Sequence, residues 1–176
     1  MSNGEIRVEG GARQLIFGDW SMPCMIGKGG LIAAADKREG DGATPLGRWP
    51  VVGALLRPDR AGLVPPAALP WRWLRPDDGW SDDPADRAYN RPVALPRATS
   101  HERLWRQDAA YDAIIVLGHN DRPPVPGRGS AIFFHSYNLG DDGQPRPTEG
   151  CVAIAPDAMR TILPRLSSGM MFDITP

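Results

Sequence analysis

Two side chains in the last third of the chain could act as a nucleophile and its base. His135 ends an apolar run that begins at Ala131, and Cys151 precedes a second apolar run, Val152 to Ile154. The segment between them is rich in Gly and Pro, which are typical of loops. Because the entropy cost of closing a loop grows only slowly with its length, the two side chains can meet. An imidazole that takes the thiol proton creates a thiolate, the reactive form of cysteine.

A second interpretation is open for the same pair. A cysteine in an apolar run is often a small buried hydrophobe, and a histidine at a strand end often satisfies its hydrogen bonds locally. Proximity along the sequence does not establish contact in space. Gly150 favours catalysis, because glycine lets the backbone turn sharply and leaves N–H groups free to face a developing oxyanion.

Short apolar segments separated by turns predict a mainly β, largely antiparallel fold. The chain has 20 Gly and 19 Pro in 176 residues, which favours turns and long ordered loops over a helical bundle. Two short helices are expected, one capped by Ser100 and one that begins near Pro156. Strands are expected at 6–9, 14–17, 22–26, 49–56, 71–75, 113–118, 131–135 and 170–174.

The alternation of side chains along 131–135 predicts the surroundings of the histidine. Phe133 and His135 share one face of that strand, and Ile132 and Phe134 share the other. An aromatic neighbour on the same face limits access of water, which favours a neutral imidazole.

Charge and cysteine content exclude several classes of function. The net charge is −1 and no basic run is present, so nothing indicates a nucleic-acid partner. Cys24 and Cys151 lack the spacing of metal ligands, and we expect no metal or other cofactor. A disulfide between them would block the nucleophile, so Cys24 is predicted to be a buried thiol in a strand. Four aspartates in 77–83 leave two alternatives, turn chemistry or a calcium loop without EF-hand spacing.

Three segments resemble the L,D-transpeptidase (YkuD) family, whose members remodel bacterial peptidoglycan with a cysteine nucleophile. The sequence from His135 to Val152 fits the pattern H-x12-[S/T]-x-G-C-[V/I]. The segment T-P-L-G-R-W at 44–49 is similar to the family's T-P-x-G-x-[F/W]. The segments 118–121 and 126–132 are similar to one branch of the family. The resemblance as a whole runs from roughly Gly27 to Ile154.

The resemblance implies a single catalytic domain over 1–176 with the family's β-sandwich, long loops and one or two short helices. It makes Cys151 the nucleophile and His135 the general base and acid. The backbone carbonyl of Ser136 would orient the imidazole, and the backbone at Gly150 would hold the oxyanion. The implied substrate-binding residues are Thr44, Gly47, Trp49, His119, Thr148 and Glu149. His119 is also a rival candidate for the general base.

The implied activity is peptidoglycan cross-linking in cell-wall biogenesis and maintenance of cell shape. Through a thioester on Cys151, stem peptides would lose D-alanine and become joined between two diamino acids. Two departures leave the outcome open: Glu149 stands where many members have His, and Ala153 where they have Arg. An L,D-carboxypeptidase or a cross-link-cleaving hydrolase would use the same residues. A non-catalytic domain that binds cell-wall peptide is the third alternative.

The expected compartment follows from the resemblance alone. The family implies the periplasm or cell envelope, with peptidoglycan stem peptides as the partner. No signal peptide and no segment long enough to span a membrane is visible, so the cytoplasm also stays open. The sequence gives neither the oligomeric state nor the identity of the donor and acceptor stems.

Overall fold

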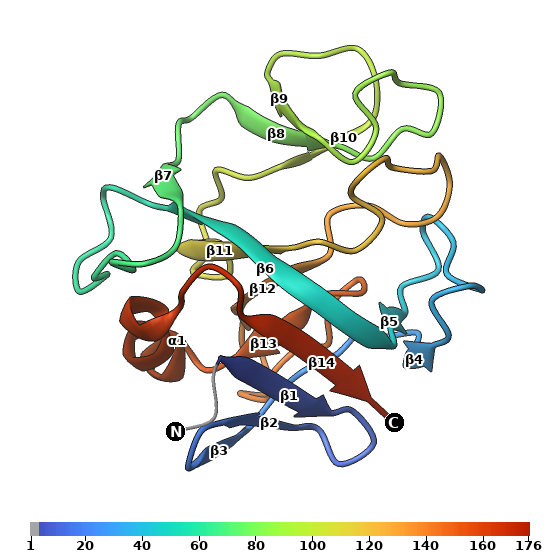
Figure 1. Cartoon of the computed structure of the whole chain (residues 1–176). Helices are drawn as coiled ribbons and strands as arrows, with labels where there is room; N and C mark the ends of the chain where they lie inside the picture. Colours follow the sequence, from blue (N-terminus) through green and yellow to red (C-terminus); the bar gives the residue numbers. More distant parts are fainter. Residues whose placement is uncertain (1–3) are drawn as a thin grey trace.

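A mixed β-sheet of nine strands forms the frame of the protein in the computed structural model, which describes residues 4–176 (Figure 1). Its strand order is β13-β12-β11-β6-β14-β1-β2-β3, and β7 pairs with β6 outside this order. The strands are β1 (Glu5–Glu9), β2 (Gln14–Phe17), β3 (Trp20–Pro23), β6 (Gly47–Leu56), β7 (Trp71–Trp73), β11 (Ala113–Leu117), β12 (Phe133–Ser136), β13 (Val152–Ile154) and β14 (Met171–Thr175). The expectation of a mainly β fold is confirmed, although β1 with β14, β6 with β7 and β12 with β13 pair in parallel.

Two small sheets and one short helix complete the fold. The three-stranded sheet holds β8 (Asp78–Ser81), β9 (Pro92–Ala94) and β10 (His101–Arg103), and lies at the top of Figure 1. The two-stranded sheet holds β4 (Leu31–Ile32) and β5 (Thr44–Pro45). Helix α1 (Pro156–Ile162) runs into a 3₁₀ turn (Leu163–Arg165). Among residues 4–176, no helix is long and apolar enough to cross a membrane.

Two hydrophobic cores lie on opposite faces of the main sheet, as the alternation along 131–135 predicts. Ile132 and Phe134 belong to the larger core, which α1 covers. Phe133 belongs to the smaller core, which also contains Cys151 and Tyr111. The strand that carries His135 is therefore buried on both sides, and its position is fixed by packing on both.

The helix expected from Ser100 is wrong, because the segment forms β10. Its residues pair antiparallel with β8, with His101 opposite Ser81 and Arg103 opposite Gly79. Arg103 occupies the position of the glutamate in a capping box, so the helix start at Ser100 lacks its second hydrogen bond. Pairing with β8 therefore determines the structure of this segment.

The expected helix after Pro156 is confirmed, with that proline at its first position and Asp157 in its first turn. The strand expected at 22–26 ends at Pro23, which has no N–H to continue the ladder. Cys24 follows directly as a fully buried free thiol, so the expected burial is confirmed but its place in a strand is wrong.

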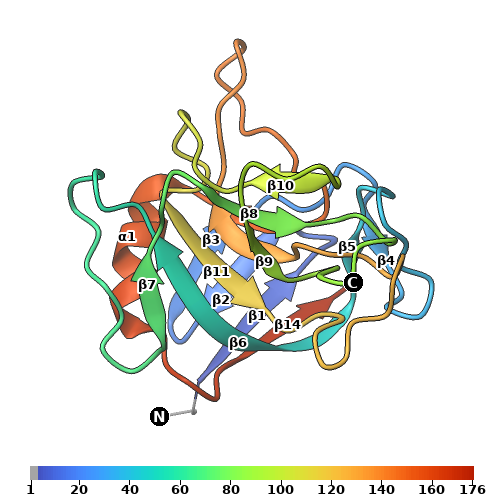
Figure 2. The same cartoon turned by 90° about the horizontal axis from the view of Figure 1, so that it is seen from above.

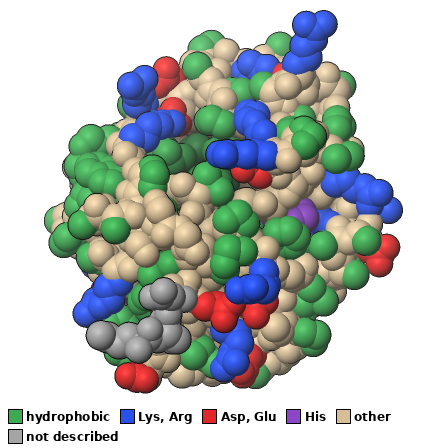
Figure 3. All heavy atoms as spheres, viewed as in Figure 1, with side chains coloured by type: hydrophobic (Ala, Val, Ile, Leu, Met, Phe, Trp, Pro, Cys, Tyr) green, Lys and Arg blue, Asp and Glu red, His purple; other side chains and the backbone are tan. Residues whose placement is uncertain are grey.

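An apolar groove is lined by residues of β6, β7 and the three-stranded sheet. It has a volume of about 450 Å³, and its walls include Val52, Trp71 and Trp80, with Arg72 and Arg91 beside them. Hydrophobic side chains gather next to Lys and Arg side chains on the face viewed in Figure 3. This groove is separate from the cleft that holds Cys151.

Replacing Ile162 by Ala should destabilise the fold because the side chain is fully buried where α1 covers the larger core. Removing it leaves a cavity, and we expect a loss of about 2–5 kcal/mol in the free energy of unfolding, measured by urea denaturation. The exposed neighbour Thr161 gives the control, since Thr161→Ala should change stability by about 0.5 kcal/mol at most. Equal effects of the two changes would contradict the packing of α1 described here.

Candidate active site

The predicted nucleophile and base lie in one cleft. Strands β12 and β13 are parallel neighbours, with His135 opposite Ala153, and Cys151 stands directly before β13. Both side chains are buried and line a cleft of about 430 Å³. The pairing of two strands therefore brings together residues that a long loop separates in the sequence.

Five segments of the chain build the walls of this cleft. They are the loop 37–40, residues 82 and 102–111, residues 130–131, and the loop 137–149. The last of these includes a hairpin in which the Gly140 N–H donates to the Gln144 carbonyl and the Arg146 N–H to that of Asn138. Figure 2 shows this hairpin projecting from the body of the protein beside the loop that leads into β11.

Backbone groups surround the Cys151 thiol. Its Sγ donates to the Ala131 carbonyl at 3.2 Å and accepts a hydrogen bond from the Phe133 N–H at 3.3 Å. Burial, and next the carboxylate of Glu102, raise the pKa of Cys151 to about 12. The resting thiol is therefore protonated. The sequence marked Phe133 only as an aromatic neighbour of His135, and no motif marked Glu102.

The His135 imidazole is held as a neutral base. Its Nδ1 donates to the Ser136 carbonyl at 2.7 Å, which leaves Nε2 without a proton. The ring of Tyr111 meets it edge-on, with centroids 5.0 Å apart, and burial lowers the pKa of His135 to about 4. The contact with Ser136 is the one that the resemblance implied, and its catalytic role stays a prediction. Tyr111 carried no sequence signal.

The thiol and the imidazole are neutral together in this arrangement. The Sγ hydrogen bonds go to backbone groups rather than to His135. Proton transfer from the thiol to the ring therefore requires Sγ to leave its hydrogen bond to the Ala131 carbonyl.

Two threonine hydroxyls hold the backbone of the nucleophile. Thr148 Oγ1 donates to the Cys151 carbonyl at 2.6 Å, and Thr44 Oγ1 lies 3.3 Å from the same oxygen. Each hydroxyl also accepts a backbone N–H, from Gly150 at 3.2 Å and from Gly27 at 2.8 Å respectively. The two motifs that carry the family resemblance therefore meet at one carbonyl, although 107 positions separate Thr44 from Cys151.

Gly150 makes a turn that a side chain would obstruct. Its φ is +134°, and a Cβ there would lie 3.0 Å from the Ala43 carbonyl oxygen. Its N–H donates to Thr148, so the predicted oxyanion role of the backbone at Gly150 stays a prediction that requires this contact to loosen.

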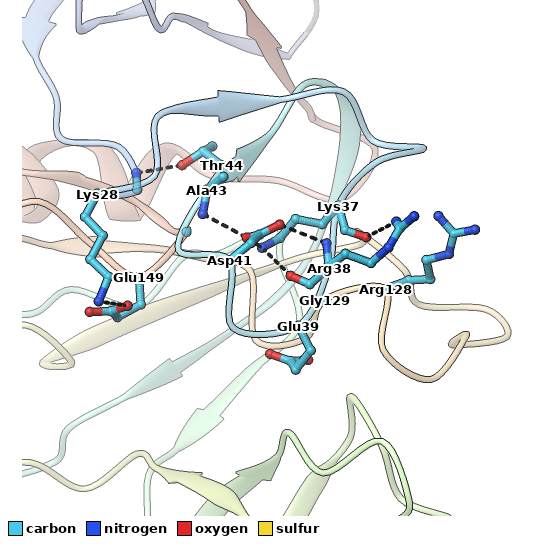
Figure 4. A network of polar contacts seen from close by, with 12 residues as sticks. Lys28, Lys37, Arg38, Glu39, Asp41, Ala43, Thr44, Arg128, Gly129 and Glu149 are labelled. Carbon is cyan, nitrogen blue, oxygen red and sulfur yellow. Dashed lines mark hydrogen bonds and ion pairs between the residues drawn. The ribbon is translucent and has the colours of Figure 1, made fainter.

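The loop before β5 is organised by one carboxylate, as Figure 4 shows. Asp41 pairs with the buried Lys37 and accepts the N–H groups of Arg38 at 2.8 Å and Ala43 at 2.9 Å. Burial opposes its ionisation, but these hydrogen bonds hold the pKa of Asp41 below its usual value. The network fixes the segment that delivers Thr44.

The other predicted substrate-binding residues divide into two groups. Thr148 and Glu149 line the cleft, and Glu149 forms an exposed ion pair with Lys28 at 2.8 Å (Figure 4). Gly47, Trp49 and His119 lie outside the cleft lining, and their contact with substrate stays a prediction.

Trp49 and His119 instead pack against each other in the body of the fold. Their ring centroids are 4.7 Å apart, and the His119 Nε2 donates to the Arg128 carbonyl at 3.1 Å. Burial lowers the pKa of His119, so this ring is a neutral packing element. Its Nδ1 is buried without a hydrogen-bond partner among residues 4–176.

The described residues support turn chemistry for the acidic stretch 77–83. Asp78 forms an ion pair with Arg72 at 2.7 Å, and Asp83 accepts the Ala85 N–H at 2.9 Å. Within residues 4–176, no group of three or more His, Cys, Asp and Glu side chains is placed to hold a metal ion.

Comparison with known families agrees with the site. The model of the YkuD family, described as the L,D-transpeptidase catalytic domain, matches residues 6–174. The match covers nearly the whole chain, and the chain therefore belongs to this family, which acts on peptidoglycan. No curated protein matches the sequence.

Thr148→Val should loosen the nucleophile, because it removes one hydrogen bond to the Cys151 carbonyl and one from Gly150. Both groups are buried, and we expect the free energy of unfolding to fall by about 1–3 kcal/mol in urea denaturation. Thr148→Ser is the matched control, since it keeps the hydroxyl and should retain most of the stability. Unchanged stability in Thr148→Val, which keeps the methyl group and lacks only the hydroxyl, would contradict the role of these hydrogen bonds.

The raised pKa of Cys151 gives the free protein a characteristic pH profile. Its thiolate fraction grows about tenfold per pH unit below the pKa, so alkylation by iodoacetamide should keep rising through pH 10. Cys24→Ala leaves Cys151 as the only thiol to be labelled. In urea the profile should level off near an ordinary thiol pKa. A plateau below pH 8 in the folded protein would instead demonstrate a preformed thiolate–imidazolium pair.

Proposed function

We propose that this protein is a peptidoglycan L,D-transpeptidase that works by cysteine acyl transfer. The observation that supports it most directly is the pairing of a thiol with a neutral imidazole in one cleft, with the imidazole Nδ1 committed to the Ser136 carbonyl. This tautomer leaves Nε2 to accept a proton, which is what a general base must do.

The first half-reaction forms a thioester. Nε2 of His135 takes the thiol proton, and Sγ of Cys151 attacks the carbonyl that joins a diamino acid to the terminal D-alanine. The carbonyl electron pair moves to oxygen and then returns as the C–N bond breaks. His135 gives its proton to the departing amine of D-alanine.

Backbone N–H groups would stabilise the charges of this step. The Phe133 N–H already faces Sγ at 3.3 Å and favours the thiolate. N–H groups at Gly150 and Cys151 would serve the oxyanion, and loss of one such donor typically costs about 100- to 1000-fold in rate.

The chain offers cations that could replace the arginine expected at position 153. Ala153 is fully buried and exchanges backbone hydrogen bonds with Met25, so an arginine side chain would have no space there. Arg146 lines the cleft from the loop 137–149 and forms no ion pair within residues 4–176, whereas Arg106 is paired with Asp108. Arg146 is therefore the side chain that we assign to a carboxylate of the stem peptide.

The second half-reaction decides between the alternatives. An amine of a second stem would form a cross-link between two diamino acids, whereas water would make the protein an L,D-carboxypeptidase or a cross-link-cleaving hydrolase. A domain that only binds cell-wall peptide would have no use for a base opposite a thiol. Because peptidoglycan lies outside the cytoplasm, we assign the protein to the periplasm or cell envelope.

Mass spectrometry of disaccharide-tetrapeptides incubated with the protein tests this function. We expect new cross-links between diamino acids, released D-alanine, and an acyl-enzyme on Cys151. Cys151→Ala should abolish all three, whereas Cys24→Ala, at a residue outside the cleft lining, should retain them. Tripeptide without cross-links would establish the hydrolase. Unchanged substrate and no acyl-enzyme, with stem peptides and existing cross-links alike, would reject catalysis.

A further inference from the structure

Three carboxylates on one side of the cleft have no ion-pair partner within residues 4–176. Glu39 comes from the loop after β4, Asp82 follows β8, and Glu102 lies in β10. The fourth acid of the lining, Glu149, pairs with Lys28, and the lining cations Lys37 and Arg106 are engaged by Asp41 and Asp108. In Figure 4, Glu39 stands apart from the Lys37–Asp41 pair. We call Glu39, Asp82 and Glu102 the acidic wall of the cleft.

Two tyrosines hold this wall in place without neutralising it. The Tyr89 hydroxyl donates to Glu39, and the Tyr111 hydroxyl donates to Oε1 of Glu102. Both rings are buried, so the carboxylates are fixed by packed side chains. Each of the two still has an oxygen that the tyrosine does not use, and a carboxylate accepts several hydrogen bonds.

Two buried acceptors beside these carboxylates lack a donor. Ser130 is only 7% exposed, its side chain lines the cleft, and its Oγ has no hydrogen-bond partner within residues 4–176. Oδ1 of Asp82 is likewise buried and unpartnered. An unsatisfied buried polar atom costs about 1–3 kcal/mol, so a ligand that supplies donors there gains that much. A primary ammonium group carries three donors and one positive charge.

The negative charge around Glu102 increases its affinity for a proton, which suits a base for a bound ammonium group. Burial raises the pKa of Glu102, and the nearby carboxylates of Asp82 and Glu39 raise it further, against the Tyr111 hydrogen bond and Arg106. A carboxylate that binds protons tightly can take one from a bound ammonium. The three carboxylates are not a metal site, because no group of three such side chains within 4–176 is close enough to hold an ion.

The wall also lies within electrostatic reach of the nucleophile. Glu102 is the largest charged influence on the Cys151 thiol, and both line the same cleft. A group bound at Glu102 would thus be near a carbonyl attached to Sγ. In the transpeptidase, the group that attacks that carbonyl is an amine, and an amine is protonated at neutral pH.

We infer that Glu102, supported by Glu39, Asp82 and Ser130 in the same cleft, binds the primary ammonium of the acceptor and removes its proton before attack. This inference rests on the proposed function and concerns only its second half-reaction. It gives the cleft two bases, with His135 serving the thiol and Glu102 serving the amine.

The proposed step balances as follows. The acceptor ammonium gives one proton to the Glu102 carboxylate and becomes a neutral amine. Its lone pair forms the C–N bond to the thioester carbonyl, and the C–S bond breaks with its electron pair on Sγ. Nε2 of His135 takes the second proton from nitrogen and passes it to Sγ. Glu102 then releases its proton to water.

The test measures the two half-reactions of Glu102→Gln separately. Gln keeps the shape of Glu and can still accept the Tyr111 hydrogen bond, but it cannot take a proton. Acylation is followed as D-alanine release and acyl-enzyme mass, and transfer as the ratio of cross-linked to hydrolysed product. We expect transfer to fall by about 100-fold, whereas acylation is retained or rises, because loss of the Glu102 charge also lowers the pKa of the Cys151 thiol. Glu9→Gln, on β1 and outside the cleft, should alter neither.

The outcomes separate this inference from the function on which it rests. Normal acylation with unchanged transfer in Glu102→Gln would overturn the ammonium subsite alone. Absence of an acyl-enzyme in the wild type would reject the proposed function. If Glu102→Gln also loses acylation, Asp82→Asn and Ser130→Ala repeat the test without touching the Tyr111 contact. Equal loss of both half-reactions in these variants as well would overturn the inference.

A second arm identifies which substrate carries the ammonium. Donor tetrapeptide with its side-chain amine acetylated should acylate the wild type at the normal rate if the subsite serves the acceptor. A slower acylation of the wild type by this donor, and no such difference in Glu102→Gln, would assign the ammonium to the donor and overturn the acceptor assignment.

Discussion

The Cys151 carbonyl is the point on which the site depends. Hydroxyls from Thr44 and Thr148 converge on it, so the strand that follows the nucleophile is tied to a segment from the first third of the chain. Buried hydrogen bonds of this kind are modest in net energy but costly to break on one side only. The geometry of the thiol is thus set by its backbone, which is held from two directions, rather than by contacts of Sγ.

Burial then determines the chemistry of the pair. The same packing that holds β12 between two cores excludes water from His135 and Cys151. This burial lowers the pKa of His135 and raises the pKa of Cys151. The pair is therefore neutral at rest and gains its charges only during reaction. A site that keeps its nucleophile protonated until a ligand arrives limits unwanted oxidation and alkylation of the thiol.

The sequence predicted most strands of the main sheet and a cleft shared by His135 and Cys151, because periodicity and short motifs are local signals, whereas β4, β5, β8 and β9 gave no such signal. The alternation along 131–135 correctly separated Phe133 from Phe134, and Pro156 correctly marked the start of α1. It failed at 101–103, where pairing with a distant strand decided the structure. Glu102 and Tyr111 could not be found, because their significance comes only from a shared cleft. The meeting of Thr44 with Thr148 is equally invisible without the fold.

The parallel pairing of β1 with β14 brings the first and last strands of the described chain side by side. In the sheet order, β14 also separates β1 from β6, so the N-terminal strands join the remainder of the sheet only through the last strand. Contacts between such distant segments form late and slowly. During synthesis, β1 therefore cannot join the rest of the sheet until β14 has been made.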